Sequence, residues 1–282
     1  PQTTEWQLSY DGRKREPVTL PVKFPLLLAQ GVEGIAVGLS TKILPHNFRE
    51  LIEGSIEILK GNKTNILPDF LTGGLADFSD YQEGLRGGKI KVRARIEEED
   101  SKTLLIKEIP YGTTTDSLID SILKANDKGK IKIKKVVDNT AKDVEIQIQL
   151  APGVSPDVTI DALYAFTDCE VSISPNASVI DGDTPRFMGV SEILKVNTDN
   201  TLQLLKRELE IRLSELEAQW HFSTLEKIFI REEMYIDFKL YSDKENLFQY
   251  MYKRFEKFKK QFIREIVDED LQRLTQIPMI RI

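Results

Sequence analysis

Four basic residues alternate with apolar ones in a short segment suited to contacting phosphate groups. The segment covers residues 89–96, and its basic members are Lys89, Lys91, Arg93 and Arg95. In a β-strand these four side chains would share one face at intervals of about 6.6 Å, with the apolar residues on the other face. That interval is close to twice the ~3.4 Å phosphate repeat along one DNA strand. The pattern therefore predicts a phosphate-contacting face, and the alternative is a solvated face without a ligand.

A second group of polar and basic residues surrounds the predicted start of a helix: Lys42, His46, Asn47 and Arg49. Asparagine is preferred at a helix N-cap, and Glu50, three residues after Asn47, completes a box-like capping signal. Donors at a helix N-terminus suit a phosphate oxygen. The alternative for His46 is a hydrogen-bonded turn residue.

Three glycines, Gly31, Gly34 and Gly38, recur among small and β-branched residues in segment 21–47. Glycine in this setting is typical of tight turns and of places where the backbone closely approaches another molecule. The segment is not a P-loop, because no Gly-Lys-Ser/Thr follows, and it lacks the order of a dinucleotide fingerprint. From these residues alone, a structural turn and a ligand-approach loop both stay open, and Ile35 is best interpreted as ordinary core.

Several other chemistries are excluded by the residue types. One cysteine, Cys169, and two histidines provide too few nitrogen and sulfur ligands for a zinc site. Cys169 is interpreted as a small, partly buried side chain, and a single cysteine fits a reducing cytosol. No run of aspartates suggests bound Mg²⁺, and no set of nucleophile, base and acid is evident. We therefore expect no catalytic residue and no metal in this chain.

The 282 residues suffice for one large domain or two ordinary ones. The net charge of −6 argues against nucleic acid as a partner, but local charge decides where a phosphate backbone lies. For a further lysine run at 128–135 we favour a solvated face. The chain has no apolar run of the ~18 residues typical of a membrane span and no secretory signal, so we expect a cytoplasmic protein without a membrane partner. Both ends resemble cuts within a longer protein.

The predicted elements divide the chain into three regions. Residues 1–67 hold extended segments and a helix that starts after Asn47 and ends at Gly61. Residues 68–195 alternate strands with a helix at 115–123; the strands are expected at 89–96, 104–109, 130–137 and 144–150. Residues 196–282 are mostly helical, with a long helix capped by Thr198 or Asp199 and a second helical tract at 244–262. The long helix carries an amphipathic stripe typical of a coiled-coil arm, formed by Leu202, Leu205, Leu209, Leu213, Leu216 and Trp220. The fold class is therefore α+β, a mixed α/β body followed by long coiled-coil-like helices.

Several ordered motifs resemble the A subunits of bacterial type IIA topoisomerases, DNA gyrase and topoisomerase IV. In the family's order the chain shows Tyr10-Asp11-Gly12, Lys23, Pro25, Gly34-Ile35-Ala36-Val37-Gly38 and Pro45-His46-Asn47. The match continues through Pro68-Asp69-Phe70, the strand ending at Arg95, Glu108-Ile109-Pro110-Tyr111 and a return-helix motif at 271–275. It covers essentially the whole chain. Departures such as Gly112-Thr113-Thr114 favour topoisomerase IV over gyrase.

The resemblance implies that the chain holds and bends double-stranded DNA. Residues 1–67 would lead from a winged-helix domain into the tower, 68–195 would be the tower body, and 196–282 would be the coiled-coil arm and return helix. Ile35 would wedge between base pairs, and Gly34, Lys23 and the two basic groups above would contact the duplex. The family's catalytic tyrosine follows an arginine. None of the eight tyrosines here does, so we expect the nucleophile upstream of Pro1 and no cleavage by this chain alone.

The resemblance also implies partners. They are an ATP-binding B subunit, which would carry Mg²⁺ and ATP, and a second copy of the A subunit, which would join through an exit gate. Together they would pass one duplex through a transient break in another. The alternative from a different class is a coiled-coil scaffold with an α/β head and no DNA role, which the net acidity and the long helix favour.

Overall fold

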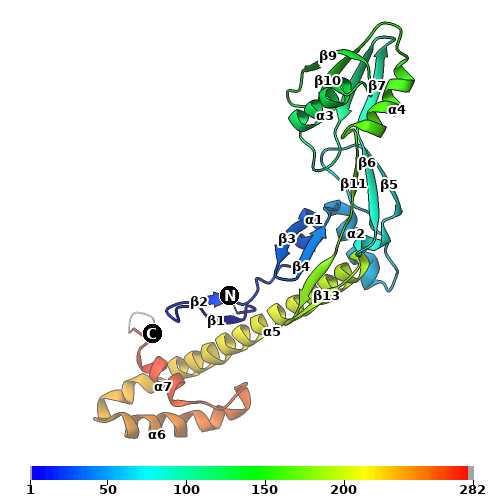
Figure 1. Ribbon diagram of the computed structural model, residues 1–282. Helices are drawn as coiled ribbons and strands as arrows, with labels where there is room; N and C mark the ends of the chain where they lie inside the picture. Colours follow the sequence, from blue (N-terminus) through cyan, green and yellow to red (C-terminus); the bar gives the residue numbers. More distant parts are fainter. Residues whose placement is uncertain (1, 279–282) are drawn as a thin grey trace. The chain divides into compact units, whose positions relative to one another are not determined.

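The computed structural model describes residues 2–278 (Figure 1). The chain forms two compact units: unit 1 comprises Pro1–Pro21 with Gln203–Ile282, and unit 2 comprises Val22–Leu202. Helix α5 (Val190–Arg231) contributes residues to both. Helices and strands are mixed throughout, which confirms the α+β class.

Unit 2 contains a first core around helix α2 (Phe48–Leu59) and a three-stranded antiparallel sheet in the order β11-β6-β5. The strands are β5 (Leu75–Asp80), β6 (Lys89–Arg93) and β11 (Glu170–Ile173). Leu51 of α2 and Ile90 of β6 are buried in one cluster with Leu194 of α5. Elements on both sides of residue 67 therefore share this core.

Helix α2 begins and ends where the sequence predicts. The Asn47 side chain accepts hydrogen bonds from the backbone N–H groups of Arg49 (3.0 Å) and Glu50 (3.4 Å). The helix stops at Leu59, and Gly61 adopts φ +86°, a left-handed conformation that favours glycine just beyond a helix end. The N-cap prediction is confirmed.

The second core of unit 2 lies between a four-stranded antiparallel sheet and two helices (Figure 1, green). The sheet order is β7-β8-β10-β9, with β7 (Arg95–Asp100), β8 (Thr103–Glu108), β9 (Ile133–Asp138) and β10 (Ile146–Leu150). The helices are α3 (Thr115–Asp127), with Thr114 as N-cap, and α4 (Pro156–Phe166). The strands predicted at 130–137 and 144–150 are confirmed by β9 and β10, which pair antiparallel. Cys169 is fully buried here, and burial raises the pKa of its thiol to about 11.

The predicted single strand at 89–96 is wrong in extent, because the chain changes sheets at Ala94. β6 ends at Arg93 and pairs with β5 and β11, whereas β7 starts at Arg95 and pairs with β8. Between them the Ala94 N–H donates to the carbonyl of Cys169 (2.7 Å). The period-two pattern continues across the break, so local alternation did not reveal it.

Unit 1 is mainly helical. It holds the hairpin of β1 (Trp6–Leu8) and β2 (Arg15–Pro17), the later part of α5, the 3-10 helices η2 (Met234–Leu240) and η3 (Glu256–Gln261), and helices α6 (Lys244–Phe255) and α7 (Asp268–Thr275). Phe229 of α5, Phe255 of α6 and Leu271 of α7 are buried in one cluster. Among the described residues no helix is long and apolar enough to cross a membrane.

The long helix is confirmed, but the predicted caps Thr198 and Asp199 are wrong. α5 begins at Val190, and the Thr198 hydroxyl donates to the Leu194 carbonyl (2.8 Å) within the helix. Val190 and Leu194 are buried in the first core of unit 2, and this packing extends the helix beyond the local capping signal. The leucine stripe is exposed, and Leu209 is 71% exposed.

A buried histidine–carboxylate pair, His221 and Asp270, links α5 to α7 in unit 1. Arg264 donates two hydrogen bonds to the Asp270 carboxylate (2.7 and 2.8 Å), and His221 Nε2 lies 3.4 Å from Asp270 Oδ2. The His221 side chain is 1% exposed. Burial lowers the pKa of His221, and the charge of Arg264 lowers it further against the opposing effect of Asp270. The imidazole is therefore held neutral.

We expect unit 1 to lose stability in mild acid. An unfolded histidine binds a proton near pH 6.5, whereas folded His221 binds one only at lower pH. Below about pH 6.5 the unfolded state therefore gains protons that the folded state lacks, and the free energy of unfolding falls. Both tryptophans, Trp6 and Trp220, belong to unit 1, so urea unfolding followed by tryptophan fluorescence at pH 5–7.5 reports on this unit.

His221→Gln should flatten this pH dependence. The matched control is His46→Gln, which removes a buried histidine of unit 2 and should leave the fluorescence-detected pH dependence unchanged. An equal fall of the unfolding free energy on acidification in wild type and His221→Gln would contradict the assignment of this pH dependence to His221.

Candidate nucleic-acid interface

An apolar side chain projects from the tip of a two-stranded hairpin in unit 2. Strands β3 (Val32–Ala36) and β4 (Leu39–Ile43) pair with Ile35 opposite Ser40 and with Val37-Gly38 as the turn (Figure 1). Gly38 supplies φ +75° in the turn. Ile35 is 92% exposed, which excludes the interpretation of this residue as core.

The root of the hairpin is tightly fixed. Gly31 has φ +68°, and a Cβ there would lie 2.7 Å from the Ile43 carbonyl oxygen, so only glycine fits. Across the root, the backbones of Lys42 and Asn176 exchange two hydrogen bonds of 2.9 and 3.0 Å. The Asn176 Nδ2 group also donates to the Ser40 carbonyl (2.6 Å). The exposed tip therefore stands on an anchored base.

Gly34 differs from Gly31 because nothing in the described chain requires a glycine there. Its φ lies outside the left-handed region, and a Cβ would meet no atom within 4 Å. Gly31 thus matches the structural-turn interpretation. For Gly34, beside the exposed Ile35, the interpretation that the backbone closely approaches a ligand stays a prediction.

The cluster at the start of α2 is only partly available to a ligand. His46 is 4% exposed, and its Nδ1–H donates to the Leu28 carbonyl (3.1 Å). Burial lowers the pKa of His46, so the ring is neutral and enclosed, in agreement with the hydrogen-bonded turn alternative. The Asn47 amide is also engaged, because its Nδ2 group donates to Asp69 (2.9 Å).

Three other predicted contacts in this part of unit 2 are accessible. Arg49 is exposed on the first turn of α2, and Lys23 is exposed just before helix α1 (Leu26–Gln30). Lys42 is partly exposed and forms an ion pair with Glu33 (3.2 Å) across the hairpin. These cations and Ile35 all belong to the segment between residues 23 and 49.

The basic face of β6 has the predicted alternation. Lys89, Lys91 and Arg93 are exposed, while Ile90 and Val92 are buried. The fourth predicted member, Arg95, belongs to β7 in the other sheet.

Carboxylates compensate this basic face. Asp80 lies opposite Lys89 and Asp77 opposite Lys91 on β5. On the other side, Glu170 lies opposite Arg93, with Nε and Oε2 2.5 Å apart. Arg95 is likewise close to Glu108 (3.6 Å). The sequence did not reveal these partners, which come from other strands and favour the solvated-face alternative for these four residues.

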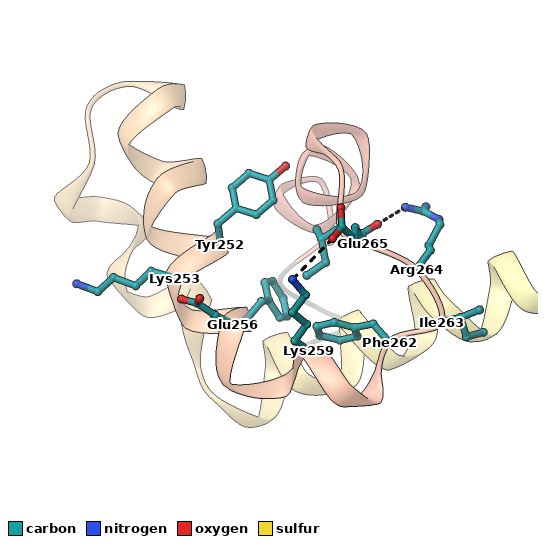
Figure 2. Close-up of a pocket in the computed structure, with 10 residues that line it drawn as sticks. Tyr252, Lys253, Glu256, Lys259, Phe262, Ile263, Arg264 and Glu265 are labelled. Carbon is teal, nitrogen blue, oxygen red and sulfur yellow. Dashed lines mark hydrogen bonds and ion pairs between the residues drawn. The ribbon is translucent and has the colours of Figure 1, made fainter.

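A hollow of about 740 Å³ in unit 1 lies beside α6, η3 and the segment before α7 (Figure 2). Two pairs of its polar groups interact within the chain: Lys259 lies 3.7 Å from Glu265, and the Tyr252 hydroxyl donates to Asp268 (2.7 Å). Burial, with this hydrogen bond, raises the pKa of Tyr252 to about 12. None of the predicted site residues lines this hollow. Within the described residues no group of three or more histidine, cysteine or acidic side chains is placed to hold a metal ion.

Comparison with known proteins identifies the family. The sequence model of the DNA gyrase/topoisomerase IV A subunit matches residues 1–282. The A subunit of DNA topoisomerase 4 from Borreliella burgdorferi is 40% identical over 281 residues, which cover 100% of this chain and 45% of that protein. The A subunit of DNA gyrase from Chlamydia trachomatis is 33% identical over 240 residues, 78% of this chain and 28% of that protein. The A subunit of DNA topoisomerase 4 from Caulobacter vibrioides is 32% identical over 238 residues, 77% and 31% of the two chains.

The chain belongs to the family of DNA gyrase and topoisomerase IV A subunits, as the ordered motifs predicted. It spans less than half the length of these curated relatives.

Asn176 is the residue of this region that the sequence analysis missed. It is 134 positions from its partner Lys42 and belongs to no motif, so no local signal was available.

Asn176→Ala removes the side-chain bond to Ser40 but keeps the backbone bridge. We expect faster hydrogen exchange in peptides covering 32–43 and a loss of about 1 kcal/mol in unfolding free energy, the typical net value of a hydrogen bond.

The matched control is Asn62→Ala, which removes an exposed amide bonded to Glu57 just beyond the C-terminal end of α2. It should leave exchange in 32–43 unchanged. If hydrogen exchange in peptides covering 32–43 is the same in Asn176→Ala and in wild type, the backbone bridge between Lys42 and Asn176 alone fixes the hairpin.

Proposed function

We propose that this chain binds and bends duplex DNA as part of the A subunit of a bacterial type IIA topoisomerase, with topoisomerase IV favoured over gyrase. The observation that carries the proposal is the exposure of Ile35 at the tip of an anchored hairpin. An apolar side chain inserted into a base step unstacks it at a cost of roughly a few kcal/mol. Contacts along the bent duplex offset that cost. The preference for topoisomerase IV rests on the relative that is 40% identical over the whole chain.

The residues around Ile35 have distinct roles in this proposal. Gly34 lets the backbone approach the duplex closely, since a side chain there would project into the open space beside the hairpin. Lys23, Lys42 and Arg49 contact phosphates, with Lys42 exchanging Glu33 for a phosphate oxygen. His46 and Asn47 act through structure, by holding helix α1 and the N-terminus of α2.

We place the chain in a larger assembly of two A and two B subunits that passes one duplex through a transient break in another. ATP and Mg²⁺ bind to the B subunit, and a second copy of the A subunit joins through the exit gate. The tyrosine that cuts DNA lies upstream of Pro1, so the chain alone holds the duplex without cleaving it. The assembly works on the chromosome in the cytoplasm.

The second candidate is a coiled-coil scaffold without a DNA role, favoured by the exposed leucine stripe of α5. The two functions differ in salt dependence. Phosphate contacts make the logarithm of affinity fall linearly with the logarithm of salt concentration, whereas a scaffold has no DNA affinity to titrate.

Ile35→Ala tests the wedge. Fluorescence energy transfer between the ends of a ~30 base-pair duplex should report a bend with wild type and a smaller bend with Ile35→Ala at saturating protein. The matched control is Leu71→Ala, which truncates another exposed aliphatic side chain of unit 2 (108% exposed) and should bend DNA as wild type does. The measurement is repeated with the polypeptide extended upstream through the tyrosine-bearing domain.

An equal bend with Ile35→Ala in the extended polypeptide would overturn the wedge. Absence of binding by both polypeptides at low salt would overturn the DNA role and leave the scaffold.

Gly34→Ala tests the close approach of the backbone. The melting temperature should stay within experimental error of wild type, because the added methyl group meets no atom of residues 2–278 within 4 Å. The Kd for the duplex should rise about tenfold, equivalent to about 1.4 kcal/mol. Gly31→Ala should instead lower the melting temperature, because its Cβ would collide with the backbone of Ile43. Unchanged DNA affinity in Gly34→Ala would remove this glycine from the interface.

A further inference from the structure

The turn between strands β5 and β6, residues 81–88, has a backbone conformation that residues other than glycine rarely adopt. Gln82 and Glu83 follow one another with φ +51° and +52°, in the left-handed region. Such residues persist only where the surrounding structure over-determines their conformation. The contacts of this turn with the rest of unit 2 therefore impose its shape, and they lead to both strands of the β3–β4 hairpin.

The first contact leads from Tyr81 through His46 to strand β3. The Tyr81 hydroxyl lies 3.5 Å from His46 Nε2, and each of the two residues is 4% exposed. Because a carbonyl oxygen only accepts, Nδ1 carries the proton in the hydrogen bond to Leu28 (3.1 Å), and Nε2 accepts from the Tyr81 hydroxyl. Burial raises the pKa of Tyr81 well above its ordinary value, so the hydroxyl keeps its proton. Leu28 belongs to helix α1, which leads directly into β3.

The second contact leads from Gly84 to strand β4. The Ala177 N–H donates to the Gly84 carbonyl (2.9 Å), and the neighbouring Asn176 exchanges two backbone hydrogen bonds with Lys42 of β4. Tyr81 and Ala177 are buried in the same cluster. The turn is therefore connected to the root of the hairpin on both sides, to β3 through α1 and to β4 through Asn176.

The turn itself is fixed by contacts that do not involve the hairpin. A Cβ at Gly88 would lie 2.3 Å from the Tyr81 carbonyl oxygen, so only glycine fits there. On the exposed side of the turn, Glu83 Oε1 lies 3.1 Å from the hydroxyl oxygen of Ser191, in the first turn of α5. An element that positions another has to be held independently of it, and this turn meets that condition.

We propose that Tyr81 is a positioning residue for the Ile35 wedge and acts through His46. This inference rests on the proposed function. A hairpin that unstacks a base step has to resist the force that the step exerts on its tip, yet a two-stranded hairpin alone is marginally stable. Hydrogen bonds fix direction, whereas apolar contacts in the core do not. The hydroxyl of Tyr81 therefore gives the end of α1, and with it β3, one fixed orientation, as a binding site requires of its supporting side chains.

Tyr81→Phe tests this role because it removes the hydroxyl and keeps the ring. Without DNA, hydrogen exchange in peptides covering 32–43 should become about fivefold faster, the factor that corresponds to the typical net contribution of one hydrogen bond. Energy transfer across the ~30 base-pair duplex should report a smaller bend at saturating protein, with both polypeptides used for Ile35→Ala. Circular dichroism checks folding. The matched control is Tyr111→Phe, which removes the hydroxyl of another tyrosine packed against the same core and should match wild type in both measurements.

Two further variants separate positioning from a general loss of stability. His46→Asn keeps an amide donor for the Leu28 carbonyl but removes the acceptor of the Tyr81 hydroxyl. It should reproduce Tyr81→Phe, and the two substitutions together should accelerate exchange no more than either alone. In the Ile35→Ala background, Tyr81→Phe should still accelerate exchange but should not reduce the bend further, because the wedge is already absent.

Unchanged exchange in Tyr81→Phe would overturn the proposal. So would a further reduction of the bend when Tyr81→Phe is added to Ile35→Ala, because the hydroxyl would then act on DNA binding by another route. If Ile35→Ala reduces the bend and Tyr81→Phe does not, the positioning role is wrong and the proposed function stands. If wild type does not bend the duplex, the proposed function is wrong, and the positioning role fails with it whatever the exchange shows.

Discussion

The geometry of the candidate interface depends on the fixed root of the β3–β4 hairpin. A two-stranded hairpin is marginally stable in water by itself, and this one carries an exposed isoleucine at its tip. It persists because Gly31 packs directly against the backbone of Ile43 and because Asn176 bridges Lys42 from another part of the chain. Those contacts are positioned by the core that α2, β6 and α5 share. Loss of that core would release the hairpin even if its own sequence were unchanged.

Charge compensation, rather than the number of basic residues, distinguishes the two lysine-rich parts of unit 2. On β6, antiparallel pairing brings Asp77 and Glu170 directly opposite basic side chains, which reduces the field that a phosphate would meet. Beside β9 the excess positive charge has no such partners among the described residues. The sequence contains two similar alternating runs of basic residues. Only the pairing of strands shows that carboxylates lie opposite the basic residues of β6.

Local signals predicted those parts of the fold that depend on local chemistry. Asn47 and Gly61 marked α2, and alternation marked β9 and β10. Signals failed where distant residues decide the outcome: Ala94 breaks the strand by bonding to Cys169, and α5 starts at Val190 because that end is buried. Of the candidate site, the exposure of Ile35 and the burial of His46 depend on tertiary packing. The proposed wedge role of Ile35 came from the resemblance to a family, since the residues alone favoured core.

The order of the chain makes unit 2 an insertion within unit 1. Unit 1 needs residues before Pro21 and after Gln203 together, as in the hydrogen bond between Gln2 and Glu215 (3.3 Å). If unit 2 were unfolded, the chain between the two segments of unit 1 would be a long loop, and closing a long loop costs conformational entropy. Unit 2 lowers that cost because its own ends are joined: the Asn197 amide donates to the Phe24 carbonyl (3.4 Å). Insertions are tolerated where the two ends of the inserted part lie close together. Folding of unit 2 therefore brings together the two segments from which unit 1 is built, while its hairpin is positioned by its own core.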